Sequence, residues 1–260
     1  VHAKICVIKK REKNKTLQYG FVSTGNLHEK TARVYGDHCL LTSNRNIMAD
    51  INKIFQFLEH PEKGYGPLER CNTLMVSPIG MRAGIENLIN HEIKQAKAGK
   101  EASITVKLNS LSDTDLIKKL NDAAVAGVTI NMIVRGIFCA LVDHKKFNVK
   151  PRAISIVDEY LEHARVMIFN NGGNEKVYIS SADWMVRNID HRIEAAVPVL
   201  DPAIKGELKD IIHIQLSDNV KARVLDSDLL NNYVPSGSKK KIRSQIETYL
   251  YLQQKTNTKK

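Results

Sequence analysis

Two segments close together in the chain, LEHARVMIF (Leu161–Phe169) and YISSADW (Tyr178–Trp184), decide the expected fold. Alternation along the first segment predicts a strand that carries His163 and Arg165 on one face. The intervening stretch Asn170–Asn174 is rich in asparagine and glycine, which is typical of a hairpin turn. The two segments are therefore expected to pair as antiparallel neighbours.

The return strand, expected over residues 177–181, places Ser181 and Asp183 beside His163. A histidine ring, a fixed cation and two hydrogen-bonding groups then converge within about 20 residues of sequence. This convergence favours a catalytic or binding site. The alternative interpretation is an ordinary hairpin with a structural histidine, and a second copy of the pattern elsewhere in the chain disfavours it.

Composition places the chain among globular proteins. Its 260 residues suffice for one large or two modest domains, and 43% apolar with 26% charged residues excludes a disordered chain. A net charge of +11 predicts attraction to polyanions such as nucleic acid, polyphosphate, nucleotides or an anionic membrane. The charge alone does not choose among them.

Cysteine usage and hydropathy indicate a cytoplasmic protein. The four cysteines are scattered without CxxC or metal-ligand spacing, which is typical of reduced thiols. No apolar run reaches the length of a membrane span and no signal peptide is visible, although peripheral membrane association stays open. The chain begins at Val1, without methionine and inside an expected strand, so we expect it to be the C-terminal part of a longer protein.

The first 70 residues predict a hairpin followed by a helix. The hairpin is expected to have strands at 1–8 and 17–22 around a polar turn at 9–15, with a further strand at 32–35. Apolar residues at helical spacing from Ile47 to Leu58 predict a helix capped by Ser43 or Asn44. The segment 60–69 is rich in proline and glycine and is the best linker candidate.

Residues 74–134 follow a βαβαβ pattern, with strands expected at 74–76, 103–108 and 128–134. Asp113 is expected to cap the second helix and Gly127 to close it. Because helices join these strands, we expect a parallel sheet with ligands at its carboxyl edge, where Lys107, Asn109 and Arg135 would lie. Further helices are expected at 202–216 and at 239–252, and the basic run 237–243 is interpreted as a solvated face or a polyanion contact. The fold class is α/β, with α+β mixed sheets.

The hairpin motif occurs twice. His2-x-Lys4 aligns with His163-x-Arg165, and each copy continues through a turn and a return strand. The histidine precedes the matching Asn26 or Asp183 by 24 residues in one copy and by 20 in the other, a difference that turn length absorbs. The match continues at equal spacing through Thr24 and Ser181, Lys30 and Arg187, Tyr35 and Arg192, and Asp37 and Glu194.

Two such halves facing each other would bring two histidines and two cations into one pocket that suits phosphoryl transfer. One histidine would attack phosphorus, the other would handle a proton, and the cations would hold the equatorial oxygens. Asp37 and Glu194 are placed to orient a histidine ring without contacting the substrate themselves. Surface carboxylates that follow strands are the alternative for these two residues.

These residues resemble the phospholipase D superfamily site, in which H-x-K is followed by a small hydroxyl residue and asparagine. Nearly the whole chain also resembles the C-terminal part of bacterial polyphosphate kinases. The matching blocks, in order, are His2–Lys4, Ser23–Asn26, Glu29–Arg33, Met75–Pro78, Lys107–Asn109, Val134–Gly136, Tyr160–His163, Ser180–Trp184, Arg187–Asn188, Val220–Arg223 and Tyr233–Pro235.

The resemblance implies two phospholipase D-like domains facing each other across the active site. The first would be truncated and span 1–70, and the second would span 71–260. It also implies reversible transfer of the terminal phosphate of ATP to inorganic polyphosphate, with Mg²⁺, through a phosphohistidine. The implied partners are ATP or ADP and polyphosphate, with a homo-oligomer and no nucleic acid expected.

The resemblance assigns His2 as the phosphorylated nucleophile and His163 as the second catalytic histidine, with Tyr35 and Arg135 in contact with ATP. To the ATP- and phosphate-binding set we add the groups that converge in the two copies and at the strand ends: Lys4, Asn26, Lys107, Arg165, Ser181 and Asp183. The family's magnesium ligands are expected upstream of this chain, so no metal ligand is assigned.

The chain departs from the family pattern at Phe21, where a histidine usually stands two residues before Ser23. Phenylalanine can neither carry a proton nor donate a hydrogen bond, so a chemical role at this position would be lost. Two other hypotheses therefore stay beside the kinase. One is a phospholipase D-like phosphodiesterase, and the other is a non-catalytic polyanion-binding relative.

Overall fold

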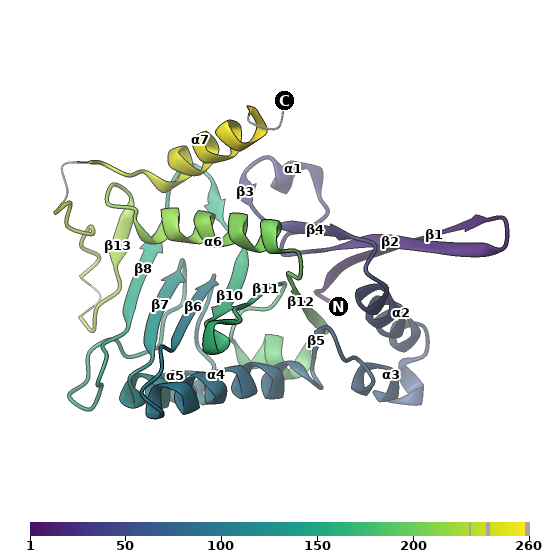
Figure 1. Cartoon of the computed structure of the whole chain (residues 1–260), viewed down its shortest axis with the longest axis horizontal. Helices are drawn as coiled ribbons and strands as arrows, with labels where there is room; N and C mark the ends of the chain where they lie inside the picture. The colour runs from purple at the N-terminus through teal and green to yellow at the C-terminus, as the bar shows by residue number, and fades with distance from the viewer. Residues whose placement is uncertain (229, 238–239, 258–260) are drawn as a thin grey trace.

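The computed structural model describes residues 1–228, 230–237 and 240–257. A large mixed sheet forms its centre, with strands in the order β13-β8-β7-β6-β10-β11-β12-β5 (Figure 1). The expected mixed α/β class is confirmed. The strands of this sheet are β5 (Met75–Ser77), β6 (Ser103–Leu108), β7 (Thr129–Val134), β8 (Arg152–Ile156), β10 (Arg165–Phe169), β11 (Lys176–Ser180), β12 (Glu194–Pro198) and β13 (Ala222–Val224).

The expectation of a wholly parallel βαβαβ sheet is wrong in one respect. β6, β7 and β8 are parallel neighbours, but β5 pairs antiparallel with β12 at the far edge of the sheet. The hairpin β10–β11 and strand β12 lie between β5 and β6 because β10 pairs antiparallel with β6. The motif-bearing hairpin thus lies at the centre of the sheet.

Helices cover both faces of the large sheet. On one face α4 (Met81–Lys97) and α5 (Thr114–Ala126) pack on Ile104, Val106 and Phe169 (Figure 1). Asp113 caps α5 by accepting from Leu116 N, and Gly127 ends it with φ +97°, as predicted. On the other face, α6 (Pro202–Leu216) and α2 (Arg45–Glu59) share a second core with the large sheet and the first hairpin. Asn44 caps α2, as predicted.

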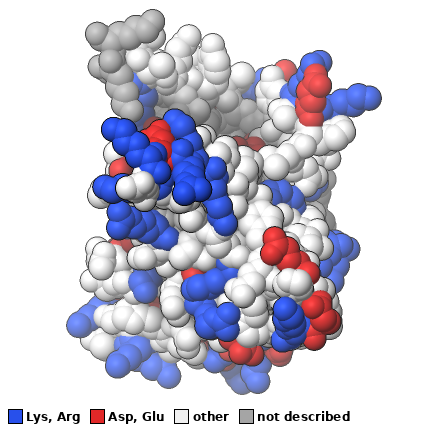
Figure 2. Space-filling view, turned by 90° about the vertical axis from the view of Figure 1, so that its right-hand side faces the viewer, with Lys and Arg blue, Asp and Glu red and all other residues white. Residues whose placement is uncertain are grey.

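The first hairpin belongs to a smaller sheet of β1 (Lys4–Glu12), β2 (Lys15–Ser23) and β4 (Cys39–Thr42). The predicted seven-residue turn at 9–15 is wrong, because both strands continue to a two-residue turn in which Lys13 has φ 50°. The hairpin therefore projects from the body (Figure 1). Figure 2 shows Lys and Arg side chains gathered over its end, where residues 9–15 contribute five cations and one carboxylate.

The predicted continuous strand 161–169 is interrupted at His163. Residues Leu161–Glu162 form β9, which pairs in parallel with β3 (Tyr35–Gly36), and β10 begins only at Arg165. The two intervening backbone N–H groups both donate to Gly36 O, at 3.1 and 3.0 Å. The chain thus passes from one sheet to the other at the histidine. The backbone on both sides of His163 is therefore held in a strand, by β9 before it and by β10 after it.

The remaining elements are short or terminal. The predicted strand at 32–35 is wrong over most of its length, because Ala32 ends α1 (Glu29–Ala32), the next two residues form a turn, and only Tyr35 lies in a strand, β3. The predicted linker contains η1 (Pro61–Lys63) and α3 (Gly66–Glu69). η2 (Asn171–Gly173) forms the second hairpin turn, and η3 (Arg187–His191) is a single π-helical turn. The last helix, α7, spans Ser244–Asn257, so it begins later than predicted, and residues 238–239 of the basic run lie outside the described residues. None of the helices in the described ranges is long and apolar enough to cross a membrane.

Candidate active site

His163 is oriented by a carboxylate from the other copy of the repeat. Nδ1 of His163 lies 2.9 Å from both carboxylate oxygens of Asp37, and the Tyr35 ring lies 4.9 Å from the imidazole ring. The Nδ1–H tautomer satisfies this contact. Burial acts to raise the pKa of Asp37, but hydrogen bonds from His163 and Thr24 and the charge of Arg165 lower it overall. Asp37 is therefore held as the anion.

His2 has the reciprocal arrangement. Its Nδ1 lies 2.8 and 2.9 Å from the two oxygens of Glu194, which is fully buried. Asn188 Nδ2 also donates to Glu194, at 2.6 Å. The histidine of the first copy thus takes its carboxylate from the second copy, and the reverse holds for His163. The sequence-based interpretation of Asp37 and Glu194 as orienting groups agrees with these contacts.

A hydroxyl group holds each carboxylate in turn. Thr24 Oγ1 donates to Asp37 at 2.6 Å, and Ser181 Oγ donates to Glu194. Each hydroxyl also accepts from the backbone N–H that follows its carboxylate, at 3.0 Å in the first copy and 3.1 Å in the second. Sequence reasoning gave Ser181 a phosphate role and gave Thr24 none. The signal was present, because both residues precede their carboxylate by 13 positions.

The two cations at matched positions have different surroundings. Arg165 is buried and donates to Asp183 through Nε and Nη2, at 3.3 and 3.0 Å. Its Nη1 reaches the backbone oxygen of Thr24 at 3.2 Å and lies 3.1 Å from Nε2 of His163. Asp183 also accepts from the backbone of Asn109 at 2.7 Å. Arg165 therefore links both copies at the imidazole of His163.

Lys4 is the cation without a partner. Its side chain is 8% exposed, and its ammonium nitrogen has no hydrogen-bond partner among the described residues. Burial lowers the pKa of Lys4 to about 8, with Glu194 acting to raise it and Arg165 to lower it further. Asn26, which matches Asp183 in the repeat, is exposed. A buried ammonium without an acceptor is costly, and an anionic ligand would supply the acceptor it lacks.

A second charged group forms at the carboxyl edge of β6 and β7. Lys107 forms a buried ion pair with Glu162, the residue before His163. Burial acts to raise the pKa of Glu162, but Lys107 outweighs it and the net shift is downward. Arg135 Nε donates to Asn109 Oδ1 at 3.1 Å and to the backbone oxygen of Glu162 at 3.2 Å. The strand-end residues Lys107, Asn109 and Arg135 thus converge as predicted.

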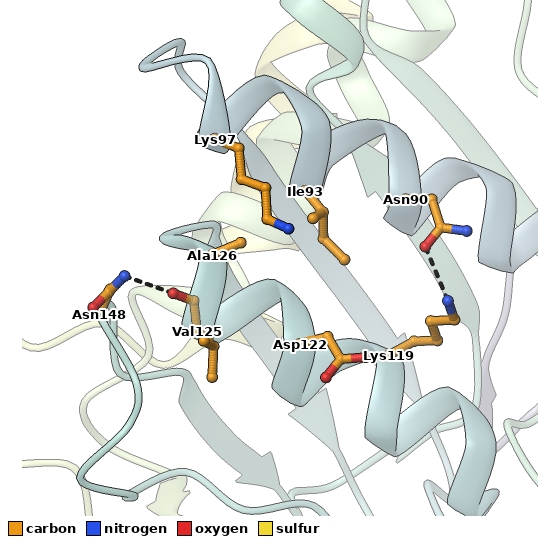
Figure 3. A pocket seen from close by; sticks show the side chains of 8 residues that line it. All are labelled: Asn90, Ile93, Lys97, Lys119, Asp122, Val125, Ala126 and Asn148. Atoms are coloured by element: carbon orange, nitrogen blue, oxygen red, sulfur yellow. Dashed lines mark hydrogen bonds between the residues drawn. The ribbon is translucent and has the colours of Figure 1, made fainter.

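Two pockets differ in the residues that line them. A pocket of about 290 Å³ is lined by Tyr35 and Arg135 together with the segment 156–162. A larger pocket of about 500 Å³ lies between α4 and α5, where Lys119 donates to Asn90 at 3.1 Å (Figure 3). None of the sequence-predicted site residues lines this larger pocket. We therefore place the candidate site at the histidines and at the smaller pocket.

Two further sequence-based expectations concern Phe21 and the ligands of a metal ion. Phe21 pairs with Cys6, two residue pairs along the hairpin from Lys4–Ser23, and alternation puts it on the same face of the hairpin as Lys4. Among the described residues no group of three or more His, Cys, Asp or Glu side chains is placed to hold a metal ion. We assign no metal ligand to this part of the chain.

The fold and site define a duplicated α/β protein with two histidines, each oriented by a carboxylate from the opposite copy. The family model for polyphosphate kinase C-terminal domain 1 matches residues 1–64, and the model for C-terminal domain 2 matches residues 74–245. The chain therefore belongs to the polyphosphate kinase family.

Individual relatives agree with this membership. The chain is 49% identical over 253 residues to a polyphosphate kinase of Vibrio parahaemolyticus and 45% identical over 252 residues to that of Escherichia coli K12. Each alignment covers 97% of this chain but only 36% of the relative, so the chain spans about a third of their length. The crystal structure of the Porphyromonas gingivalis polyphosphate kinase superimposes with a TM-score of 0.92 at 42% identity, covering 99% of this chain and 39% of that one.

Proposed function

We propose that this chain forms the part of a polyphosphate kinase that transfers a phosphoryl group between ATP and inorganic polyphosphate. The crossed pairs His2–Glu194 and His163–Asp37 carry the proposal. Each pair combines a nitrogen nucleophile or proton carrier with a buried carboxylate that orients it. The unpartnered Lys4 and the cations around residues 9–15 support an anionic substrate.

His2 is the proposed nucleophile. Its Nδ1 faces Glu194, which leaves Nε2 to form a bond with the γ-phosphorus of ATP while the bond to the β-phosphate oxygen breaks and ADP leaves. A terminal oxygen of polyphosphate then attacks the same phosphorus, the N–P bond breaks, and the polymer gains one phosphate. A phosphoramidate and a phosphoanhydride are close in energy, so transfer runs in both directions.

His163 and the cations assist this transfer. With Nδ1 held by Asp37, Nε2 of His163 is the proposed site for a proton of the incoming or departing oxygen. Lys4 and Arg165 would hold the equatorial oxygens and offset the repulsion between anionic donor and acceptor. Tyr35 and Arg135 are the proposed nucleotide contacts, as they line one pocket. Bound Mg²⁺ would neutralise phosphate charge, and no ligand for it is proposed on this chain.

The test uses the complete protein with ATP labelled at the γ-phosphate. We expect acid-labile label on His2 in the wild type, no label in His2→Ala, and normal label in the control His144→Ala, because the ring of His144 contacts Lys146 and Phe147 and no site residue. Addition of polyphosphate should discharge the label into polymer. Label that is absent from wild type, or that persists in His2→Ala, would rule out the proposed intermediate.

One observation favours a second candidate function. Phe21 removes any proton role at a position on the Lys4 face of the hairpin. A non-catalytic relative would bind polyphosphate tightly and with steep salt dependence but without turnover. A phosphodiesterase would instead release choline or nucleotides from test substrates.

The organisation of the whole protein follows the same proposal. We propose that 1–70 and 71–260 belong to two catalytic domains that share the site, since each supplies one histidine and the other's carboxylate. Homo-oligomerisation and cytoplasmic location stay predictions from the sequence.

A further inference from the structure

A glutamine of the last helix forms hydrogen bonds with the segment that leads into His163. Gln245, in the first turn of α7 (Ser244–Asn257), accepts from Tyr160 N at 3.0 Å and donates to Tyr160 O at 2.8 Å. Its amide also donates to Glu162 Oε1 at 2.9 Å. The side-chain amide thus pairs with the backbone of Tyr160 as a neighbouring strand would.

Glu162 joins this contact to the site. Its carboxylate accepts from Lys107 and from Gln215 Nε2 of α6, the latter at 2.9 Å, and its backbone oxygen accepts from Arg135. Partners from α6, α7 and β6 therefore fix the side chain of Glu162, which is 8% exposed. The next residue is His163, whose backbone N–H is held by Gly36 O. A shift of Glu162 would move the histidine and the Arg135 guanidinium together.

The start of α7 is itself anchored. Arg243 makes two 2.8 Å hydrogen bonds with the two carboxylate oxygens of Asp158, and Ser244 N donates to Asp218 at 2.7 Å. Asp158 and Tyr160 line the pocket that contains Tyr35 and Arg135. Arg243 and the first turn of α7 therefore hold one wall of that pocket at two points, the ion pair at Asp158 and the amide contact at Tyr160.

We propose that Gln245 is a positioning residue for His163. It contacts neither histidine, and it acts by holding Tyr160 and Glu162 so that the imidazole meets Asp37 on one side and the phosphate on the other. The inference rests on the proposed phosphoryl transfer, and it gives the C-terminal helix a part in it. Catalytic groups need placement to a fraction of an ångström, and losses of about 10- to 100-fold follow from small displacements.

The test compares variants of the complete protein in single-turnover labelling with γ-labelled ATP. Gln245→Leu keeps the size of the side chain and removes all three hydrogen bonds, whereas Gln245→Glu keeps only the acceptance from Tyr160 N. We expect both to slow labelling of His2 by about 10- to 100-fold with little change in the ATP concentration at half-maximal rate. Gln253→Ala, an exposed glutamine of the same helix, should match the wild type.

A merely structural role is separated by a double-variant cycle with Asp37→Asn. Both substitutions act on His163, so the combined loss should be clearly smaller than the product of the two single losses. A product of full size, or wild-type rates in both Gln245 variants at an unchanged Tm, overturns the positioning role. Absence of label in the wild type overturns the proposed function and this inference with it, so the two failures are distinguishable.

Discussion

Asp37 orients His163 across the two halves of the molecule, with both carboxylate oxygens 2.9 Å from Nδ1 although the residues are 126 positions apart. Glu194 orients His2 in the opposite direction over 192 positions. Each half supplies a histidine to its own site and a carboxylate to the other. Neither half completes a histidine–carboxylate pair alone, and apolar residues of both halves pack together in one shared core.

Neutral replacements of the two carboxylates should impair the histidines that they orient. In Asp37→Asn and Glu194→Gln, an NH2 group replaces one carboxylate oxygen, and an NH2 group can only donate. It must therefore face a group that itself donates to the carboxylate, either Nδ1–H of the histidine ring or, at Glu194, the Asn188 amide. We expect a fall in kcat of about 100-fold or more, the usual range for losing a general acid or base. Steady-state synthesis of polyphosphate by the complete protein measures this.

The crossing itself can be tested by separating the two steps. Because Glu194 contacts His2 and, of the two histidines, Asp37 contacts only His163, labelling of His2 should slow more in Glu194→Gln than in Asp37→Asn. The control is Asp143→Asn, an exposed carboxylate that pairs with Lys150. Equal slowing of His2 labelling by Glu194→Gln and Asp37→Asn, with the control unchanged, would contradict the crossed arrangement.

The matched hydroxyls give a second prediction. Thr24→Val keeps the shape of the side chain but removes the 2.6 Å bond to Asp37. Ser181→Ala does the same to Glu194, and each leaves a backbone N–H without its acceptor. Loss of one such bond to a charged group costs about 1.5–3 kcal/mol, so the free energy of unfolding should fall by this amount in both variants.

Denaturant unfolding monitored by fluorescence or circular dichroism measures that change. Thr31→Val, which removes an exposed hydroxyl bonded to His28 O, serves as the control and should change stability by less than about 1 kcal/mol. If the free energy of unfolding fell in only one of the two variants, the two matched hydrogen bonds would contribute differently to stability despite their equal geometry.

Patterns of side chains predicted the elements that depend on local signals. The caps Asn44 and Asp113, the left-handed Gly127 and the strand ends at Lys107 and Arg135 follow from short-range rules, and all are confirmed. The repeat also pointed to Asp37 and Glu194, since equal spacing survives in both copies.

What sequence could not give depends on contacts between distant segments. Alternation in 161–169 predicts one strand, and only the pairing of Leu161 with Tyr35 reveals the break at His163. The position of β5 at the edge likewise depends on β12, whose residues pair with those of β5 across 117 to 121 positions of sequence. Gln245 and Glu162 carry no motif, and their connection appears only when α7 packs beside β9.

A third prediction concerns Phe21. A histidine there would share a face with Lys4 and Ser23, within a hairpin whose backbone is paired on both sides of β2. Phe21→His therefore fits without rearrangement, and we expect activity to rise in the complete protein if the side chain takes part in proton transfer, by about 10-fold or more. Tyr19→His, two residue pairs further out on the same face, is the control. No difference between Phe21→His and wild type would assign position 21 a packing role only.

Lys4 gives the pH dependence. Its pKa of about 8 means that the free site loses this charge as pH rises through 8. Since only the ammonium form attracts phosphate, kcat/KM for ATP should fall by up to about tenfold per pH unit above that value. Lys4→Arg keeps the charge and should move this alkaline limb to higher pH, and Lys4→Met should lack it and have low activity throughout. An unchanged limb in Lys4→Met would assign it to another group.

The Lys4 ammonium group, which is expected to attract phosphate, should also lower the stability of the folded protein. Its pKa in the folded protein lies below the ordinary value of 10.5, so the charged form is disfavoured by folding and the cost is fully present below pH 8. The cost falls as pH rises from 8 to 10.5, because over this range the unfolded chain keeps a proton on Lys4 that the folded chain has lost. Above pH 10.5 neither state carries this proton and the cost has gone. Lys4→Met should therefore raise the free energy of unfolding by about 1–3 kcal/mol at pH 7, the cost of a buried group without a partner. The gap to wild type should close near pH 10.5, and saturating polyphosphate, which supplies the missing acceptor, should close it at pH 7 as well.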